Sequence, residues 1–230
     1  MGEAMRAIDV MVREVVTVHP ETDVADAVKL LGKHDVSALP VVDDDGRLVG
    51  LISEADLIRR VELGTEKHRT WWLEAVTGAS ALAEEFAKSH GKKVDEVMSE
   101  HVVSASEDTP LAEIAALMER NRIKRVPITR GDKLVGIVSR SNLIQALASA
   151  LSHSQPEGAN GKDREIRHEV LDRLAEQKWT DFGARNIIVS NGVVHVWGLV
   201  SSEAERKALI ALAEEVPNVQ RVSDEMIADY

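Results

Sequence analysis

The hydrophobic and polar positions of this chain follow one pattern twice. Residues 50–57 and 136–143 each consist of a glycine, a short apolar run, a serine, and a polar residue three positions after that serine. This arrangement predicts a buried strand that runs into a helix, with the serine as the N-cap. Free N–H groups and the positive dipole end of a helix favour an anion such as phosphate. Two such termini indicate a module with two binding sites.

The residues before the first serine predict two more strands and a helix. Residues 15–18 and 38–42 are short apolar runs, and an acidic turn with a glycine over 43–46 separates the second run from 48–52. Thr22 is placed to cap a helix, because Val24, Ala27, Val28 and Leu31 follow it at helical spacing. The predicted order is therefore β-α-β-β-α.

A second copy of this unit follows. Met98 repeats Met11 at an offset of 98 − 11 = 87, and Gly136 repeats Gly50 at an offset of 136 − 50 = 86, so the second copy has lost one turn residue. A match held over most of a unit with a gap only in a turn indicates an internal repeat.

The two copies resemble a tandem pair of CBS domains (cystathionine β-synthase-type domains) over residues 8–60 and 94–149. The matching motifs are Val16-Thr17-Val18 and Val103-Ser104-Ala105, Leu39-Pro40-Val41 and Val126-Pro127-Ile128, and the two Gly-to-Asp/Asn segments. The resemblance implies that the two units pack pseudo-symmetrically, that the clefts between them bind adenine nucleotides, and that two pairs form a dimer.

The resemblance also implies the binding residues. Ser53 is expected to contact phosphate, and Asp56 is expected to accept hydrogen bonds from the ribose hydroxyls, which suits a carboxylate. The expected cleft of the first repeat is completed by Thr17, Ser37, Ala38, Leu39 and Pro40, with Val41 as a further apolar wall. Its counterpart in the second repeat comprises Ser104, Lys124, Arg125, Val126, Pro127, Ser139, Arg140 and Asn142.

Two features leave alternatives open. The Ser53-to-Asp56 spacing also fits a capping box whose role is only to satisfy helix N–H groups. In the second repeat Asn142 replaces the expected Asp, while Lys124, Arg125 and Arg140 add positive charge for a phosphate or else form a solvated strand end. We therefore expect unequal sites.

Residues 61–93 form an insertion between the repeats. An apolar stripe at helical spacing runs from Trp71 and Trp72 to Phe86. We expect a helix that packs on the repeats or on a dimer partner, because aromatic side chains bury large areas.

A linker over residues 150–161, with Pro156, Gly158 and Gly161, precedes a further domain over 162–230. The pattern predicts a helix over 163–177, strands over 187–189 and 193–200 joined by a turn at Asn191-Gly192, a helix to about residue 215 and a strand over 219–227. The predicted order is α-β-β-α-β.

This domain resembles a BON domain. The matching segments are 188–194, 197–203 and 216–222, in which Asn218 stands where the family has glycine. The family is associated with phospholipid and envelope contacts. Here, however, the domain carries nine Lys or Arg and thirteen Asp or Glu, a net charge of −4, which disfavours anionic lipid. A protein contact, a small ligand or an uncharged lipid contact is expected instead, and His195 is expected to be an ordinary strand residue.

Composition narrows the class of protein. The net charge is −11, so nonspecific nucleic-acid binding is disfavoured, and there is no Cys for a disulfide or a zinc–thiolate site. The N-terminal residues lack the apolar core of a signal peptide, and no apolar run approaches the roughly 18 residues of a membrane span, so we expect a cytoplasmic protein.

The motifs contain no nucleophile–base pair, metal cluster or P-loop, so no enzyme and no required metal are expected. The sequence thus predicts an α+β protein: a non-enzymatic, homodimeric sensor of AMP, ADP or ATP, with S-adenosylmethionine also fitting the cleft. The alternative is a dimeric adaptor in which the C-terminal domain binds phospholipid or protein and the repeats are a scaffold.

Overall fold

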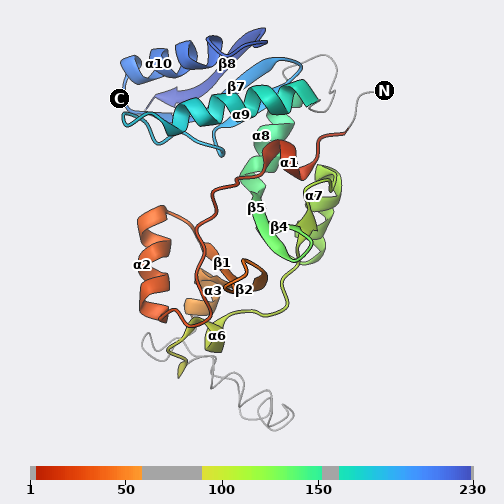
Figure 1. The fold of residues 1–230 in the computed structure, drawn as a ribbon, viewed down its shortest axis with the longest axis vertical. Coiled ribbons are helices and arrows are strands. Elements are labelled where there is room, and N and C mark those ends of the chain that lie inside the picture. The colour runs from red at the N-terminus through yellow and green to blue at the C-terminus, as the bar shows by residue number, and fades with distance from the viewer. Residues whose placement is uncertain (1–3, 59–89, 152–160, 229–230) are drawn as a thin grey trace. The chain divides into compact units, whose positions relative to one another are not determined.

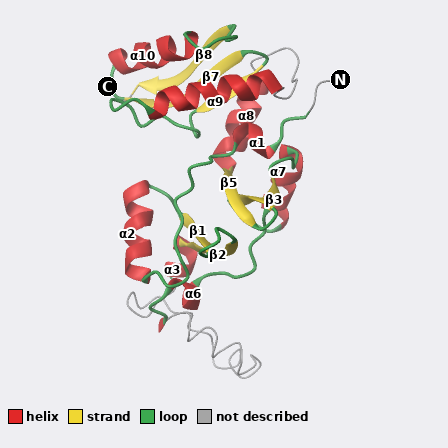
Figure 2. Cartoon of the chain, in the orientation of Figure 1, coloured by secondary structure: helices red, strands yellow, loops and turns green. Residues whose placement is uncertain are grey.

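The computed structural model describes residues 4–58, 90–151 and 161–228 (Figures 1 and 2). Most of the expected insertion, including Trp71 and Trp72, and most of the expected linker lie outside these ranges. Contacts divide the chain into two units. The first-repeat unit comprises residues 15–102 and 129–134, and the second-repeat unit comprises residues 1–14, 103–128 and 135–230. Each is described by itself.

The first-repeat unit is built around a two-stranded antiparallel sheet. Strands β1 (Ala38–Val42) and β2 (Leu48–Ser53) pair with Leu39 opposite Ile52. Helix α2 (Val24–His34) buries Val24, Ala27 and Leu31, which share one face. Among the described residues of this unit there are also the short helices α3 (Glu54–Leu57) and α6 (Val94–Val97). The strand expected over 15–18 is reduced to a single parallel bridge between Val18 and Val41.

The second repeat has a similar arrangement. Its sheet has the order β3 (Ala105–Ser106), β4 (Arg125–Arg130) and β5 (Lys133–Ser139), with helices α1 (Ala7–Val10), α7 (Leu111–Arg120) and α8 (Arg140–Leu151). The tip of the β4–β5 hairpin, residues 129–134, groups with the first-repeat unit. From β3 onward the second repeat shows the predicted β-α-β-β-α order.

The segment that precedes each repeat in sequence packs on the other repeat. We call these two stretches, which contain Met11 and Met98, the leading segments. Met11 precedes the first repeat in sequence, yet its sulfur lies only 2.6 Å from where a Cβ on Gly136 of β5 would stand. Conversely, Met98 precedes the second repeat and packs so closely on Gly50 of β2 that a Cβ there would collide with its sulfur. Helix α1 accordingly contributes Ala7 and Val10 to the second-repeat core, and α6 contributes to the first-repeat core. Both glycines are needed for this close approach.

The C-terminal domain has the predicted α-β-β-α-β order. It consists of α9 (Gly161–Ala175), β6 (Ile187–Ser190), β7 (Val193–Val200), α10 (Glu203–Glu214) and β8 (Arg221–Ala228). Strand β7 is central, antiparallel to β6 and parallel to β8. Both helices cover one face of this sheet, where their apolar side chains form a single core with the strands (Figure 1).

Three residues of this domain have left-handed backbone where the sequence predicted turns. Asn191 and Gly192 have φ of 52° and 72°, which is the conformation of a tight hairpin turn. Asn218 has φ of 69°, so it adopts the conformation for which glycine is usually chosen. Asparagine tolerates this region better than other side chains, which explains why the replacement is accommodated.

A buried ionic junction joins the C-terminal domain to the second repeat. The Asp9 carboxylate, 1% exposed, accepts hydrogen bonds from Arg164 Nε at 2.6 Å and from the Arg6 N–H at 2.8 Å. One turn along α9, Arg167 donates to the carbonyl oxygens of Met11, Ala184 and Ile187 at 3.2, 2.9 and 2.9 Å. Ile188 of β6 is buried in the second-repeat core, so apolar packing accompanies the charges.

Burial and the nearby Arg13 lower the pKa of Arg167 to about 10, against an opposing effect of Asp9. The guanidinium therefore remains charged at neutral pH, and its three carbonyl partners take the place of water. This junction fixes the C-terminal domain on the second repeat.

We predict that Arg167→Met lowers the free energy of unfolding by about 2 to 4 kcal/mol, because three buried carbonyls lose their donor. Arg206→Met is the matched control. Arg206 Nε lies 2.6 Å from Asp224 Oδ2, but both side chains are more than a quarter exposed, so its loss costs at most about 1 kcal/mol. Urea denaturation followed by tryptophan fluorescence measures both. Equal destabilisation by the two substitutions would contradict the structural role assigned to Arg167.

Candidate functional site

Each repeat contributes one set of predicted binding residues, which we call a half-site. The first half-site lies where β2 passes into α3. The Ser53 N–H and Oγ both donate to Asp56 Oδ2, at 2.9 and 2.7 Å. This is the capping geometry that the spacing predicted, with the carboxylate holding the start of the helix. Among the described residues, the other oxygen of Asp56 receives no hydrogen bond. Because the cap uses only Oδ2 and the residue is half-buried, Oδ1 can still accept a hydrogen bond.

The second half-site, between β5 and α8, has the same geometry with an amide in place of the acid. The Ser139 N–H and Oγ donate to Asn142 Oδ1, both at 2.8 Å, and the Asn142 N–H approaches Ser139 Oγ at 3.4 Å. The cap therefore engages the only side-chain oxygen of Asn142. What remains for a ligand is the amide nitrogen, which is a donor.

Equivalent backbone contacts confirm that the two half-sites correspond. The Glu54 N–H donates to the Ser37 carbonyl at 3.1 Å, and the Arg140 N–H donates to the Lys124 carbonyl at the same distance. A left-handed residue follows the preceding helix in each case: Asp35, the C-cap of α2, has φ of 49°, and Arg122, which comes directly after the C-cap of α7, has φ of 54°. Ser37 thus corresponds to Lys124, and Glu54 corresponds to Arg140.

The apolar members of each set are buried. Leu39 and Val126 are both 0% exposed and belong to the hydrophobic cores of their units, and Pro40 and Pro127 are also buried. Ala38, at 6% exposed, begins β1 directly beside Ser37. Thr17 is half-buried and Ser104 is exposed. The apolar members therefore anchor the strands that lead to the two half-sites.

The three basic residues of the second half-site differ in their surroundings. Lys124 is exposed at the start of the strand, and Arg125 is half-buried and makes a further interaction. Arg140 is exposed, and its Nη2 donates to the Ile123 carbonyl at 3.2 Å, which holds the side chain back toward the residues before β4. All predicted residues of the first repeat lie in one unit and all those of the second repeat lie in the other.

Sequence patterns missed the junction of Asp9, Arg164 and Arg167. The available signal was weak: Arg167 lies beside Ile166 on the apolar side of a helix that was read for its Ile, Val and Leu positions. His195, expected to be an ordinary strand residue, lies fully buried in β7 with Nδ1 3.6 Å from Glu225 Oε1. In the described ranges, no group of three His, Asp or Glu side chains is arranged to hold a metal ion. None of the described helices is long and apolar enough to cross a membrane.

Comparison with protein families assigns both parts of the chain. The CBS domain model matches residues 7–63 and 94–149, and the BON domain model matches residues 162–229. The chain is a CBS-domain pair followed by a BON domain. The two capped half-sites are therefore those of a CBS pair, and the ionic junction joins the second CBS repeat to the BON domain.

Related proteins share the CBS pair. An uncharacterized protein of Methanocaldococcus jannaschii is 32% identical over 157 residues, covering 64% of this chain and 93% of that protein. The chloroplastic CBS domain-containing protein CBSX2 of Arabidopsis thaliana is 32% identical over 135 residues, which is 56% of this chain and 57% of its own length. A crystal structure of CBSX2 in complex with AMP matches with a TM-score of 0.56 and 29% identity, covering 64% of this chain and 99% of that chain.

The two caps generate a prediction about stability. Asp56→Asn leaves an amide oxygen that can accept both bonds from Ser53, as Asn142 does from Ser139, so we expect a loss of only a few tenths of a kcal/mol. Asp56→Ala removes the acceptor and should cost about 1 kcal/mol. Denaturant midpoints of the two variants measure this difference. Equal losses for Asn and Ala would mean that the cap contributes nothing.

Proposed function

We propose that this protein is a non-enzymatic sensor that binds adenine nucleotides in its CBS pair. The observation that carries the proposal is the free Oδ1 of Asp56, held in place by the cap on Oδ2. A half-buried carboxylate with one oxygen not used by the cap is suited to accept hydrogen bonds from the two hydroxyls of a ribose. The likeness to CBSX2, whose structure was solved with AMP, supports the same ligand class.

The remaining predicted residues have consistent roles in this proposal. Ser53 and Ser139 lie at strand ends where a phosphate would meet them, and Leu39, Pro40, Val126 and Pro127 provide the apolar surroundings that an adenine base needs. AMP, ADP and ATP all fit this description, and S-adenosylmethionine shares the adenosine part. No metal is required for any of these contacts.

A continuous set of contacts leads from the second half-site to the BON domain. Strand β5 ends at Ser139, Gly136 of that strand is in close contact with Met11, and the Met11 carbonyl accepts from Arg167 of the BON domain. A ligand that favours one geometry of β5 would thereby favour one placement of the BON domain. We propose this as the route by which binding reaches a partner.

We predict that calorimetric titration of the intact chain with AMP, ATP and S-adenosylmethionine gives saturable binding to at least one. Asp56→Ala should weaken that binding about tenfold or more at the first half-site, while Asp56→Asn should weaken it less, because only the charge is lost. The measured stabilities of these variants separate loss of the cap from loss of the ligand contact.

Two results would contradict the proposal. Binding of all three ligands unchanged in Asp56→Ala would exclude the first half-site. No heat with any of the three would favour an adaptor instead, with the CBS pair as a scaffold and the BON domain as the binding part. The observation favouring that second candidate is an apolar pair, Leu199 and Ile227, which are register partners on β7 and β8 and are 63% and 66% exposed.

We also propose that the CBS pair forms a homodimer. Helix α8 exposes Ile144, Leu147 and Leu151 by 66, 59 and 77%, and their spacing places them on one face. Ile58, at the position of the first repeat that corresponds to Ile144, is 57% exposed. Repeated exposure of a large apolar side chain at corresponding positions is typical of a surface that is covered by a partner.

The dimer is tested by Leu147→Glu, which places a charge in the middle of this stripe and should convert a dimer to a monomer in sedimentation velocity. Val28→Glu is the control, since Val28 is also apolar and 49% exposed but lies on α2, outside the stripe. A native chain that sediments as a monomer, or a dimer that both substitutions leave intact, would refute the assignment of this face.

A further inference from the structure

The two half-sites carry opposite charge at corresponding positions. The first half-site has three acidic residues, Asp35, Glu54 and Asp56. Their counterparts beside the second are Arg122, Arg140 and the neutral Asn142, and Lys124 replaces the uncharged Ser37. The hydrogen bonds and left-handed residues shared by the repeats establish this correspondence from the backbone, independently of the side chains.

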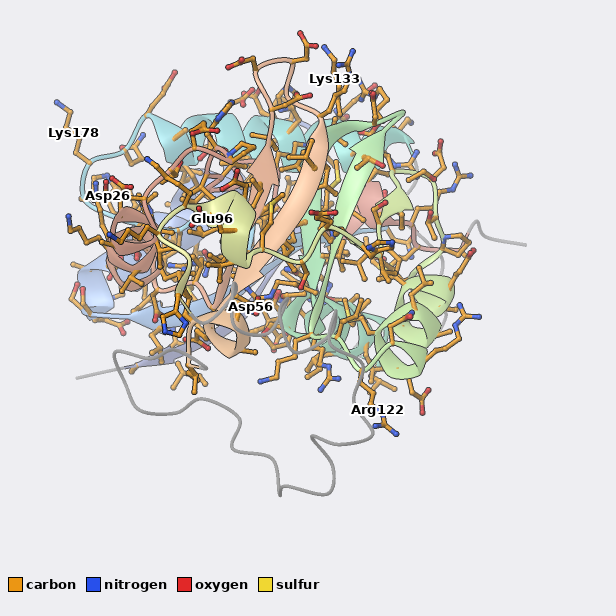
Figure 3. The ribbon with its side chains drawn as sticks, turned by 90° about the horizontal axis from the view of Figure 1, so that it is seen from below. Asp26, Asp56, Glu96, Arg122, Lys133 and Lys178 are labelled. Carbon is orange, nitrogen blue, oxygen red and sulfur yellow. The ribbon has the colours of Figure 1, made fainter. Side chains whose placement is uncertain are left out.

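The basic side chains beside the second half-site are accessible to a ligand from solvent. Arg122, Lys124 and Arg140 are all exposed, and Arg140 is held toward the 122–124 segment by its bond to the Ile123 carbonyl. In Figure 3, Arg122 extends away from the ribbon. Within the described part of the chain, no ion pair to Arg122, Lys124 or Arg140 shorter than 4.0 Å is formed, so their charge is not neutralised by a neighbouring acid.

The first half-site carries acidic residues where the second carries basic ones. Glu54 is exposed next to Ser53, and Asp35 is exposed at the end of α2, two residues before Ser37. Each added phosphate brings negative charge close to these carboxylates, and like charges at such separations repel. The free oxygen of Asp56, by contrast, still accepts from a ribose, whose hydroxyls are uncharged.

Resting on the proposed function, we infer that the two half-sites divide their ligands by charge. The second-repeat half-site, through Arg122, Lys124 and Arg140, binds nucleotides with a phosphate chain. The first-repeat half-site, through Asp35 and Glu54, disfavours a phosphate chain even though Ser53 lies at its strand end, and it prefers adenosine derivatives whose 5′ substituent carries no net negative charge. One CBS pair thus responds to two classes of adenosine compound.

The experiment exchanges residues between corresponding positions of the intact chain. In the variant Lys124→Ser/Arg140→Glu, the second half-site receives the residues of the first. We expect ATP affinity to fall by about 10- to 100-fold, as expected for the loss of two charge-assisted contacts, with S-adenosylmethionine affinity changed by less than about threefold. The reciprocal variant Ser37→Lys/Glu54→Arg should raise the ATP stoichiometry from one per chain to two.

Salt provides an independent readout. ATP affinity of the native chain should fall steeply as ionic strength rises, because ATP carries several negative charges. S-adenosylmethionine, with a net charge of about +1, should show a much weaker dependence. Glu54→Arg alone, at an exposed position, serves where the double variant does not fold, and it should by itself add measurable ATP binding at the first half-site. Circular dichroism checks that each variant is folded.

The outcomes distinguish the inference from the function on which it rests. Native ATP stoichiometry of two, or exchange variants with unchanged ATP affinity, overturns the division of ligands and leaves the nucleotide sensor standing. No binding of ATP, AMP or S-adenosylmethionine to the native chain overturns both. Binding of one ATP per native chain, together with loss of that binding in Lys124→Ser/Arg140→Glu, supports both the division of ligands and the nucleotide sensor.

Discussion

The burial of the Arg167 guanidinium is the constraint on which the second-repeat unit depends. A charge placed at that depth is tolerated only where carbonyl oxygens converge on it, and here they come from Met11, Ala184 and Ile187. These three residues belong to the N-terminal segment and to the BON domain. Their positions are therefore coupled, and Asp9 with Arg164 strengthens the same coupling. The C-terminal domain is in this way a packed part of the unit that contains the second CBS repeat.

The capping box does two things in each CBS repeat, and its chemistry decides what is left for recognition. A carboxylate has two oxygens, so Asp56 satisfies Ser53 with one and keeps the other as an acceptor. An amide has only one oxygen, and in Asn142 this oxygen accepts both hydrogen bonds from Ser139. The difference between the repeats is therefore one of hydrogen-bond polarity as well as charge. One carboxylate can therefore serve both the cap and the ribose contact that we propose for Asp56.

Local patterns were sufficient to predict the repeats, their offset, the order of elements in the second repeat and in the BON domain, and the turns at Asn191-Gly192 and Asn218, because each depends on residues near in sequence. The caps at Ser53 and Ser139 were likewise predictable from spacing. The prediction that Thr22 caps a helix was wrong, because α2 has Asp23 as its N-cap and Thr22 Oγ1 instead accepts from the His19 N–H. What local patterns could not predict is where distant segments pack. Met11 and Met98 were matched correctly as repeat positions, yet each contacts the glycine of the other copy. Arg167 resembles any solvent-facing arginine until its three carbonyl partners are known. The strand expected over 15–18 is limited to the bridge at Val18.

Because the leading segments are exchanged, the compact units of the structure do not coincide with the repeats of the sequence. The segment that carries Ala7, Val10 and Met11 is synthesised well before residues 103–128 and 135–230, in which it has its partners. Met11 must await Arg167 and Ile188, which at about 5–20 residues per second are made on the order of 10 to 35 s later. The first CBS repeat similarly waits for α6 and Met98. This segment is thus synthesised long before it can reach its place, and during that interval its apolar residues Val10 and Met11 are without their native cover.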